Sequence, residues 1–484
     1  MSEPKWHPMS SRKIVTRIVV KTELVLLSPA HFGNGDSENA TDMPLLKDER
    51  DDKSPLIPGS SICGALRSYL KSLENGHQSK RGEPSSLVES LFGSDKHSSE
   101  KQQSRVIVTD TIGKYRGHEQ RQGVRLRPES RTAEDDALYS YRLWATNTIF
   151  PLRIELVISE DNDRDQLLNG FVHALAGLSN GGISLGAKKT RGFGRVSTGP
   201  WRIAEYDMRK QSDLLAWITG QESGGRTTSL DNILDYSKSQ AGLTDRREEL
   251  EIKADFALDS SILIRSRSGL SASDPDVVHI HRPLADGAGE IAVIPGTSWA
   301  GALRTRASRI MELAAGKTRG SSAVDSLFGS SPEIRTNQKA SRIRIDESII
   351  ENCREDLVQN RVAIDPFTGG ARDGALFDEK PVFATPDGRV PLRLKIINPV
   401  NTDIGLSLLL LKDLWTGDIP IGGESSVGRG RFHGLRAEII LKQQSGTKNW
   451  IITEDSGKLE ITGGDRQQLE SYVSSLRSNA EILK

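Results

Sequence analysis

The chain has 484 residues, enough for about two to four domains of roughly 100–200 residues each. Lys plus Arg and Asp plus Glu both total 65, so the formal net charge is zero, and contact with a nucleic acid would need local basic patches. The spacing of Cys63 and Cys353 supports neither a disulfide framework nor a zinc site. The first residues lack the apolar core of a signal peptide and no apolar run could span a bilayer, so we expect a soluble, cytoplasmic protein.

The first predicted element is a strand over residues 17–28, where apolar and polar residues alternate as in a half-buried strand. A loop over 28–55 follows, and loops above roughly 12–15 residues are usually functional or disordered. It is acidic and contains Asp36, Asp42, Asp48, Asp51 and Asp52. A carboxylate beside a nucleic acid can bind a divalent cation or assist attack by a hydroxyl, although composition alone favours a solvated, flexible loop.

The next element, "IPGSSICGALRSYL" at 57–70, is predicted to be a Pro-Gly turn that runs into a helix with Ser60 or Ser61 as N-cap. The free N–H groups and the positive dipole end of such a helix suit a phosphate. Arg67 and Lys71 lie on one face of it, four residues apart. Simple capping of a helix with a surface Arg explains this segment equally well when it is taken alone.

A glycine-rich loop, "GAKKTRGFGR" at 186–195, ends the first half of the chain. Its glycines and cations are Gly186, Gly192, Gly194, Lys188, Lys189, Arg191 and Arg195. Glycine lets a backbone approach a phosphate closely, and Lys and Arg supply charge. The loop is neither a Walker loop nor a dinucleotide-binding fingerprint, and a tight β-turn with solvated charges is the alternative interpretation.

These elements recur in the second half of the chain, in the same order and at offsets of 236 to 240 residues. "IPGSSICGALR" returns as "IPGTSWAGALR" at 294–304, "SRVIVTD" as "SRIRID", "PLRIEL" as "PLRLKI", and the glycine-rich loop as "IGGESSVGRGRF" at 421–432. The second copies contain the possible N-caps Thr297 and Ser298, Arg304, and the loop residues Gly422, Gly428, Gly430, Arg429 and Arg431. Two copies with the same glycine spacing favour phosphate binding over a plain turn.

The repeat sets the expected domain boundaries: a first module over 1–205, a connector or packing segment over 206–249, a second module over 250–436, and closing strands and a helix over 437–484. The order of strands and helices predicts an α+β fold in which each module is a ferredoxin-like split β-α-β unit with an antiparallel sheet. A second long loop, 266–292, carries Asp274, Asp276, Asp286, His279 and His281.

Together these motifs resemble the RAMP superfamily of CRISPR systems. More closely, the chain resembles two fused copies of the backbone subunit of type III effector complexes, as in fusions of the III-D and III-E kind. The resemblance implies RRM-like modules that hold a guide RNA along two successive segments, with target single-stranded RNA and other effector subunits as partners and no membrane. A thumb hairpin from each module, at 124–144 and 360–383, would interrupt the guide–target duplex.

The repeats and the resemblance together assign one set of residues to RNA binding. These are Ser60, Ser61, Arg67, Gly186, Lys188, Lys189, Arg191, Gly192, Gly194, Arg195, Thr297, Ser298, Arg304, Gly422, Gly428, Arg429, Gly430 and Arg431.

Target-cleaving members of this family carry a catalytic Asp in the loop before the "IPGSS" helix. In the first module "TDMPLLKD" points to Asp42 as catalytic residue and metal ligand, with Asp48 nearby and Asp36 as the next candidate. The implied reaction is endonucleolytic cleavage of target RNA with Mg²⁺ or Mn²⁺, in which the 2′-hydroxyl attacks and a 2′,3′-cyclic phosphate remains.

The second module departs from this pattern. "IHRPLAD" places His281 where the Asp would stand, so Asp276 becomes the catalytic candidate, with Asp274 and Asp286 as supporting residues. The first module is therefore expected to be the more active of the two.

Three alternatives remain open. The chain could be a catalytically silent RNA-binding scaffold of the same complex, with both acidic loops solvated. It could process guide RNA through His279 and His281, although the first module has no matching pair. It could also be a nucleotide-dependent enzyme, although the glycine-rich loops lack the Lys-Ser/Thr of a phosphate-binding loop.

Overall fold

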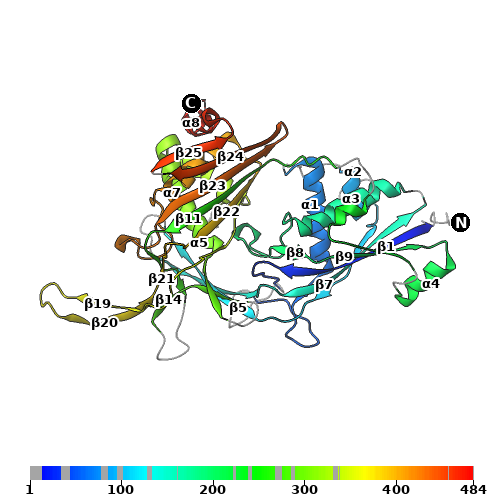
Figure 1. The fold of residues 1–484 in the computed structure, drawn as a ribbon, viewed down its shortest axis with the longest axis horizontal. Helices are drawn as coiled ribbons and strands as arrows, with labels where there is room; N and C mark the ends of the chain where they lie inside the picture. The colour runs from blue at the N-terminus through cyan, green and yellow to red at the C-terminus, as the bar shows by residue number, and fades with distance from the viewer. Residues whose placement is uncertain are drawn as a thin grey trace, which may run out of the picture.

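The computed structural model of the chain describes residues 13–33, 44–77, 85–94, 102–127, 133–160, 162–221, 225–237, 243–266, 275–284, 289–330, 336, 338–455 and 457–482. In this part of the chain the two sequence repeats form two bodies of sheet and helix (Figure 1), which we call module 1 (residues before 238) and module 2 (residues after 242). No helix of the described residues is long and apolar enough to cross a membrane.

Module 1 is built on an antiparallel sheet with the strand order β10-β9-β1-β7-β3. In the central strand β1, Ile18 pairs with Leu156 of β7 and with Glu205 of β9. The elements of module 1 are β1 (Ile14–Leu26), β2 (Leu56–Ile57), α1 (Gly59–Asn75), α2 (Ser86–Phe92), β3 (Val106–Val108), β4 (Thr111–Ile112), β5 (His118–Leu126), β6 (Ala133–Trp144), β7 (Ile149–Ser159), α3 (Arg164–Ser179), the 3₁₀ turn η1 (Lys189–Arg191), β8 (Val196–Thr198), β9 (Trp201–Asp207), α4 (Gln211–Thr219), β10 (Arg226–Leu230) and the 3₁₀ turn η3 (Ile233–Tyr236).

Helices α1 and α3 cover one face of the module 1 sheet. Because side chains alternate along a strand, Ile18 and Val20 of β1 point to this face. They share one buried core with Leu70 of α1 and Leu175 of α3. On the opposite, outer face of the sheet, α4 packs Ala216 against Val19, Ala204 and Tyr206 in a small second cluster.

Module 2 repeats this plan with the strand order β17-β22-β11-β23-β24-β25, again antiparallel. Its elements are β11 (Glu249–Leu258), β12 (Ser261–Ile262), β13 (Arg265–Ser266), β14 (Val277–His279), β15 (His281–Pro283), β16 (Glu290–Ile294), α5 (Gly296–Ala315), α6 (Lys317–Phe328), β17 (Ile343–Ile345), β18 (Ser348–Ile349), β19 (Gln359–Ile364), β20 (Ala371–Lys380), β21 (Val382–Phe383), β22 (Val390–Ile397), α7 (Asn401–Trp415), the 3₁₀ turn η4 (Ser425–Val427), β23 (Phe432–Gln443), β24 (Gly446–Asp455), β25 (Lys458–Gly463) and α8 (Arg466–Ile482).

The inner strands of the two sheets correspond, since β3-β7-β1-β9 in module 1 matches β17-β22-β11-β23 in module 2. The predicted combination of helices with antiparallel sheets is confirmed, and the strand order is consistent with a split β-α-β unit. The outer strands differ. β10 extends the first sheet into the segment expected to be a connector, whereas β24 and β25 extend the second sheet.

Both segments considered as thumbs form antiparallel hairpins. Strands β5 and β6 pair in module 1, and β19 and β20 pair in module 2. Figure 1 shows the β19–β20 hairpin projecting from module 2 on the side away from module 1. The two thumbs therefore have different surroundings.

The predicted N-caps of the two repeated helices are wrong. Helix α1 begins at Gly59 with Pro58 as N-cap, and α5 begins at Gly296 with Pro295 as N-cap, so the expected serines and threonine lie within the first turn. The Pro ring fixes φ near −60°, and the Pro carbonyl accepts the first hydrogen bonds of the helix. A Cβ on Gly59 would lie 2.2 Å from the carbonyl oxygen of Val108, so each helix starts in close contact with the neighbouring strand.

Candidate nucleic-acid interface

The two glycine-rich loops have the same backbone conformation. Their left-handed residues, in order, are Gly186 (φ +87°), Lys188 (+53°), Gly192 (+84°) and Gly194 (+71°) in module 1, and Gly422 (+89°), Glu424 (+58°), Gly428 (+87°) and Gly430 (+71°) in module 2. A Cβ on Gly194 or Gly430 would lie within 2 Å of a carbonyl oxygen of the same loop, 1.7 Å and 1.9 Å away. Close packing of the loop on itself thus explains these glycines without a phosphate.

The loop of module 1 packs against module 2. A Cβ on Gly192 would lie 2.7 Å from the backbone nitrogen of Glu347, and the carbonyl oxygen of Arg191 lies 2.4 Å from the Cβ position of Gly296. The loop therefore covers the first turn of α5 and the end of β17. In module 2 the corresponding Gly428 has no atom of the described part of the chain within 4 Å of its Cβ position.

Ion pairs hold this junction between the modules. Arg195 of the loop pairs with Asp346 at 3.0 Å. Arg121 of the thumb strand β5 pairs with Glu347 and, at 2.7 Å, with Glu119 of its own strand. Arg282 of β15 approaches Glu347 to 3.3 Å from the other side. The side chains of Arg121 and Glu347 are both only 3% exposed, so the thumb of module 1 is anchored in a buried network.

Four cations from the two modules gather at the same junction, and we call Lys189, Arg191, Arg304 and Arg344 the cationic seam. Burial and the charge of Arg344 lower the pKa of Lys189. Burial and the charge of Arg304 lower the pKa of Arg191. Among the described residues, neither Lys189 nor Arg191 pairs with a carboxylate, whereas Arg304 pairs with Asp325 at 2.5 Å. An anion bound at the seam would relieve the repulsion between these side chains.

Other residues assigned to RNA binding have structural partners instead. The ammonium of Lys188 lies over the rings of Tyr141 and Tyr139, 3.9 and 4.4 Å from their centroids. Arg67 donates to the carbonyl oxygen of Phe92 at 3.4 Å, so that it ties α1 to the end of α2. In the corresponding place Arg304 donates to the carbonyl oxygen of Gly329 at 2.9 Å.

In module 2 the arginines of the loop are engaged. Arg429 is buried, with its guanidinium 2.9 Å from Glu379 and 2.7 Å from Glu424. Arg431 donates to the carbonyl oxygen of Gly417 at 3.1 Å. The structure therefore brings Lys189, Arg191 and Arg304 together and keeps Arg429 apart from them.

The first helical turns differ in exposure. Ser60 and Ser61 of α1 are exposed, whereas Thr297 and Ser298 of α5 are half-buried next to the loop of module 1.

Sequence reasoning found Arg304 but missed the other residues on the module 2 side of the junction. Arg344, Asp346 and Glu347 replace Ile107, Thr109 and Asp110 of the first repeat, so the signal was a difference between otherwise matching motifs. Arg121 belongs to no quoted motif, and Arg282 lies within "IHRPLAD" but was assigned no role there.

The acidic loops are only partly within the described residues, because Asp36, Asp42, Asp274 and Asp286 lie outside them. Asp48 is held by its neighbour: its carboxylate accepts from Nε of Arg50 at 3.0 Å, and this hydrogen bond lowers its pKa. Asp276 is exposed, and its Oδ2 accepts from the backbone N–H of Asp378 at 3.0 Å. Asp48 and Asp276 therefore each have a protein partner, in separate modules.

The two histidines of the second loop are also engaged. His279 is fully buried: its Nδ1 accepts from the backbone N–H of Ile264, and its Nε2 donates to the carbonyl oxygen of Val293. Burial lowers the pKa of His279 to about 3. Nε2 of His281 lies 2.9 Å from Glu355. A pair of exposed catalytic histidines is therefore not formed by these two side chains.

No group of three or more His, Cys, Asp or Glu side chains suited to a metal ion occurs among the described residues. Asp42, the predicted ligand of Mg²⁺ or Mn²⁺, lies outside the described residues, so the metal site stays a prediction.

The fold and the junction define a protein of two homologous α/β modules that share one cationic seam. A family model for the RAMP superfamily matches residues 23–197 and 267–433, which span both modules and more than half of the chain. The chain belongs to the RAMP superfamily, and this membership indicates a subunit of a CRISPR effector complex with RNA and other subunits as partners. The comparison with curated proteins gave no match.

Proposed function

We propose that the chain is a guide-RNA-binding backbone subunit of a type III effector complex, in which two fused ferredoxin-like modules bind two successive segments of the guide. The observation that carries this proposal is the cationic seam. It combines Lys189 and Arg191 of module 1 with Arg304 and Arg344 of module 2, so one strand bound there contacts both modules.

The charge arrangement supports a phosphate backbone as the ligand. Lys189 is exposed and Arg191 is half-buried, so both remain accessible to a ligand. Burial and, after it, repulsion from Arg344 and Arg304 of module 2 lower the pKa of Lys189 and Arg191, and no carboxylate among the described residues has to be displaced from them. Backbone contacts of this kind bind RNA regardless of sequence, which leaves sequence to be read by pairing between strands.

Open copies of the junction surfaces support neighbouring subunits at both ends. The loop of module 2 is uncovered, since Val427 is 57% exposed and the Cβ position of Gly428 is open. At the other end Ser60 and Ser61 of α1 are exposed, where the corresponding turn of α5 is covered. In a row of subunits, the glycine-rich loop of a preceding subunit would cover the first turn of α1. The loop of module 2 would in turn cover the first turn of the corresponding helix in a following subunit.

RNA binding by the full chain tests the guide-binding proposal. Replacing both Lys189 and Arg191 by Ala should weaken binding of a labelled single-stranded RNA about tenfold and reduce the slope of log K against log salt by about 0.7 for each phosphate that is no longer bound. The matched control replaces Lys458 and Arg466 by Ala, which removes one Lys and one Arg from the exposed far side of module 2. Equal affinities of the two double variants, measured by fluorescence anisotropy, would refute the proposal.

We further propose that module 1 cleaves target RNA through Asp42 and that module 2 is silent. The pattern "TDMPLLKD" supports the first half of this proposal. The second half is supported by His281, which stands in the place of the Asp and lies against Glu355, and by Asp276, which is bound to the N–H of Asp378.

Cleavage of a guide-complementary RNA by the reconstituted complex with Mg²⁺ or Mn²⁺ tests this second proposal. Asp42→Ala should remove one product band and leave guide binding intact, whereas Asp276→Ala should leave every band in place. Loss of a band with Asp276→Ala would make module 2 a nuclease as well. An unchanged pattern with both variants would make the chain a scaffold.

A further inference from the structure

A row of cations crosses the outer face of the module 1 sheet, opposite α1 and α3. Lys21 of β1 pairs with Arg153 of β7 on one side and with Arg202 of β9 on the other. Since neighbouring strands lie about 4.8 Å apart, the three side chains stand next to one another over about 10 Å. We call Arg153, Lys21 and Arg202 the cation row. Arg153 is paired with Glu155 of its own strand at 3.1 Å, so the repulsion between like charges that favours an anion acts mainly between Lys21 and Arg202.

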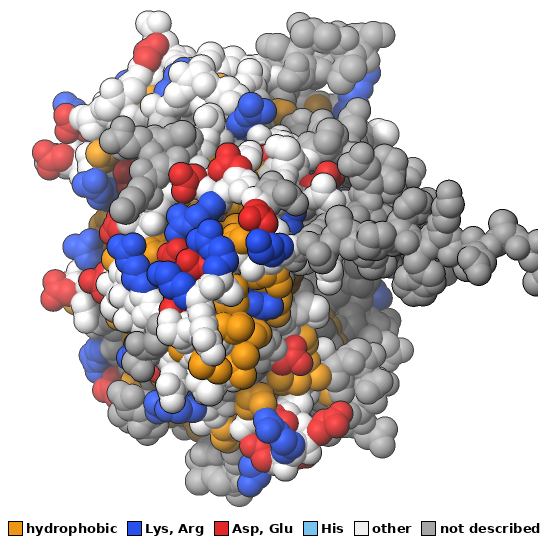
Figure 2. Space-filling view, turned by 90° about the vertical axis from the view of Figure 1, so that its right-hand side faces the viewer, with side chains coloured by type: hydrophobic (Ala, Val, Ile, Leu, Met, Phe, Trp, Pro, Cys, Tyr) orange, Lys and Arg blue, Asp and Glu red, His pale blue; other side chains and the backbone are white. Residues whose placement is uncertain are grey.

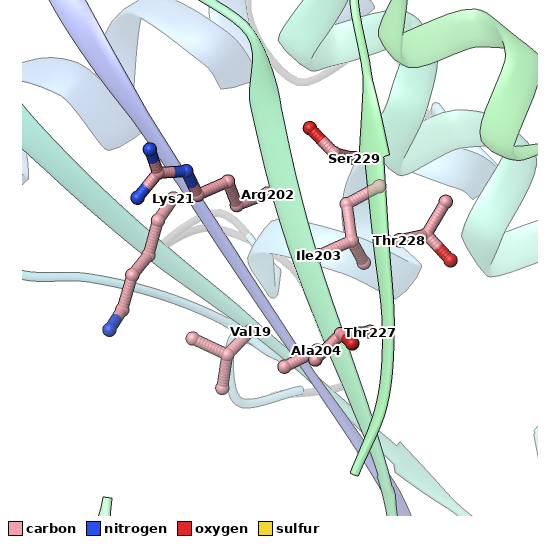
Figure 3. Close-up of a pocket in the computed structure, with 8 residues that line it drawn as sticks. All are labelled: Val19, Lys21, Arg202, Ile203, Ala204, Thr227, Thr228 and Ser229. Atoms are coloured by element: carbon pink, nitrogen blue, oxygen red, sulfur yellow. The ribbon is translucent and has the colours of Figure 1, made fainter. Parts of the chain in front are cut away.

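The cation row borders a shallow hollow of about 390 Å³ on this face. Figure 3 shows the side chains of Lys21 and Arg202 extending to the same side of neighbouring strands. The hollow has Val19 and Ala204 in its lining, and β10 adds the hydroxyl groups of Thr227 and Ser229, whereas the side chain of Thr228 points to the other face of the strand. Arg202 is exposed and forms no ion pair with the described residues.

Figure 2 faces the end that carries module 1 and shows several Lys and Arg side chains next to one another in one area, with acidic side chains among them. Basic side chains are thus grouped on this face although the chain as a whole is neutral.

Module 2 has the same framework with a different charge. Lys253 of β11 pairs with Arg393 of β22, but its partner on β23 is Glu438 in the place of Arg202. The ammonium of Lys253 lies 3.6 Å from Glu251 and 4.0 Å from Glu438. The corresponding hollow of module 2 is therefore lined by both signs of charge.

We propose that the cation row of module 1 is a second RNA site, which contacts phosphodiester groups of a strand outside the cationic seam. This inference rests on the proposed RNA-binding function. Lys and Arg side chains recognise phosphates, and the hydroxyls of Thr227 and Ser229 are further donors. Among the described residues no aromatic side chain lines the hollow, so the site binds the backbone without stacking bases and without sequence preference.

The composition of the hollow favours RNA over an acidic protein segment. Its apolar lining consists of the small or branched side chains of Val19, Ile203 and Ala204, and Ile203 is itself part of the buried core. Protein interfaces have a fully buried core that is more apolar than this and enriched in aromatic side chains. A phosphate backbone can be bound by the row of charges and hydroxyl donors alone, without an apolar or aromatic core.

A charge swap between the modules tests the proposal. Arg202→Glu gives module 1 the charge pattern of module 2, and Glu438→Arg gives module 2 the pattern of module 1. For the full chain and a labelled single-stranded RNA, Arg202→Glu should weaken binding about three- to tenfold and lower the salt slope by about 0.7 for each phosphate that is no longer bound. Glu438→Arg should tighten binding. The melting temperature of Arg202→Glu should not fall, because module 2 already tolerates a Lys–Glu neighbour at this place.

Crosslinking in the reconstituted complex identifies which RNA strand, guide or target, contacts the cation row through its phosphates. Crosslinking of guide RNA alone and of guide RNA paired with target shows which strand is no longer crosslinked to module 1 in Arg202→Glu. Unchanged RNA affinity in both swap variants would overturn the inference. So would failure of complex assembly at unchanged RNA affinity, which would indicate an acidic protein partner. When the swap variants leave RNA affinity unchanged but the Lys189 and Arg191 double variant still binds RNA more weakly, the proposed function stands without the second site. When that double variant also keeps the wild-type RNA affinity, the second site and the proposed function both fail.

Discussion

At the scale of single residues, the two modules join the glycine-rich loop to the thumb through different side-chain interactions. Between loop and thumb, module 1 uses a cation over rings, with Lys188 on Tyr141 and Tyr141 next to Phe193. Module 2 has Glu424, Glu379 and Arg429 at the corresponding positions, joined by ion pairs. Both arrangements connect the glycine-rich loop to the base of the thumb.

His279 gives the first prediction. Burial lowers the pKa of His279 from 6.5 to about 3. Between pH 3 and pH 6.5 the unfolded state therefore binds a proton at this side chain and the folded state does not. Above about pH 6.5 this difference does not affect the free energy of unfolding. Below that pH the free energy of unfolding falls by about 1.4 kcal/mol per pH unit. From pH 7 to pH 5 we expect a loss of about 2 kcal/mol from this group.

Urea denaturation of the wild type and of His279→Gln at both pH values isolates this contribution. The variant should lose less stability than the wild type on acidification, whatever its stability at pH 7. Parallel pH dependences of the two proteins would contradict a buried neutral His279.

At the scale of elements, the matched loops offer a controlled substitution. Gly192 and Gly428 have φ values of +84° and +87°, so Ala costs about 1–2 kcal/mol of backbone strain at either position. Only at Gly192 does the added Cβ meet module 2, 2.8 Å from Cα of Asp346. Gly192→Ala should therefore lower the free energy of unfolding more than Gly428→Ala does.

Hydrogen exchange shows where that additional destabilisation occurs. The backbone amides of β17 and of the start of α5 should exchange faster in Gly192→Ala and remain protected in Gly428→Ala. Equal protection in both variants would mean that the loop does not support the junction.

Much of the element plan could be predicted because the repeat compares the chain with itself. The paired motifs located the helices, the loops and the hairpins, since each copy confirmed the other. The N-caps were wrong because Ser60 and Thr297 are good capping residues, but Pro58 and Pro295 already supply the backbone geometry.

Three residues of the cationic seam, Lys189, Arg191 and Arg304, could be predicted from the sequence, and the fourth could not, for a physical reason. Lys189 and Arg191 stood out because glycines surround them. Arg344 lies on a strand of the other module, and no local pattern states which surfaces of two modules meet. The same holds for Arg202, whose importance depends on pairing across three strands.

At the scale of the whole molecule, the two modules are joined through a buried carboxylate. Glu347 lies between Arg121 of module 1 and Arg282 of its own module. Glu347→Ala would leave Arg282 without its partner and weaken the hold on Arg121, and removing one member of a buried pair costs about 3–5 kcal/mol. We expect the junction to loosen while each core stays intact.

Limited proteolysis and small-angle scattering measure this loosening. Glu347→Ala should be cut faster between the modules and have a larger radius of gyration than the wild type. The control is Glu351→Ala, since Glu351 is exposed on the same segment. Identical behaviour of the two variants would mean that the buried pairs do not hold the modules together.

The contact between the loop of module 1 and the first turn of α5 joins two different surfaces, so it gives the molecule a direction. In a head-to-tail contact each module contributes one of two different surfaces, so one surface of each kind remains at the ends of the pair. These are the loop at Gly428 and the helix start at Gly59. A row of such modules has a leading and a trailing end, like the strand it would follow. Fusing two modules in one chain sets their order once and for all, and only the outer ends are left to select neighbours.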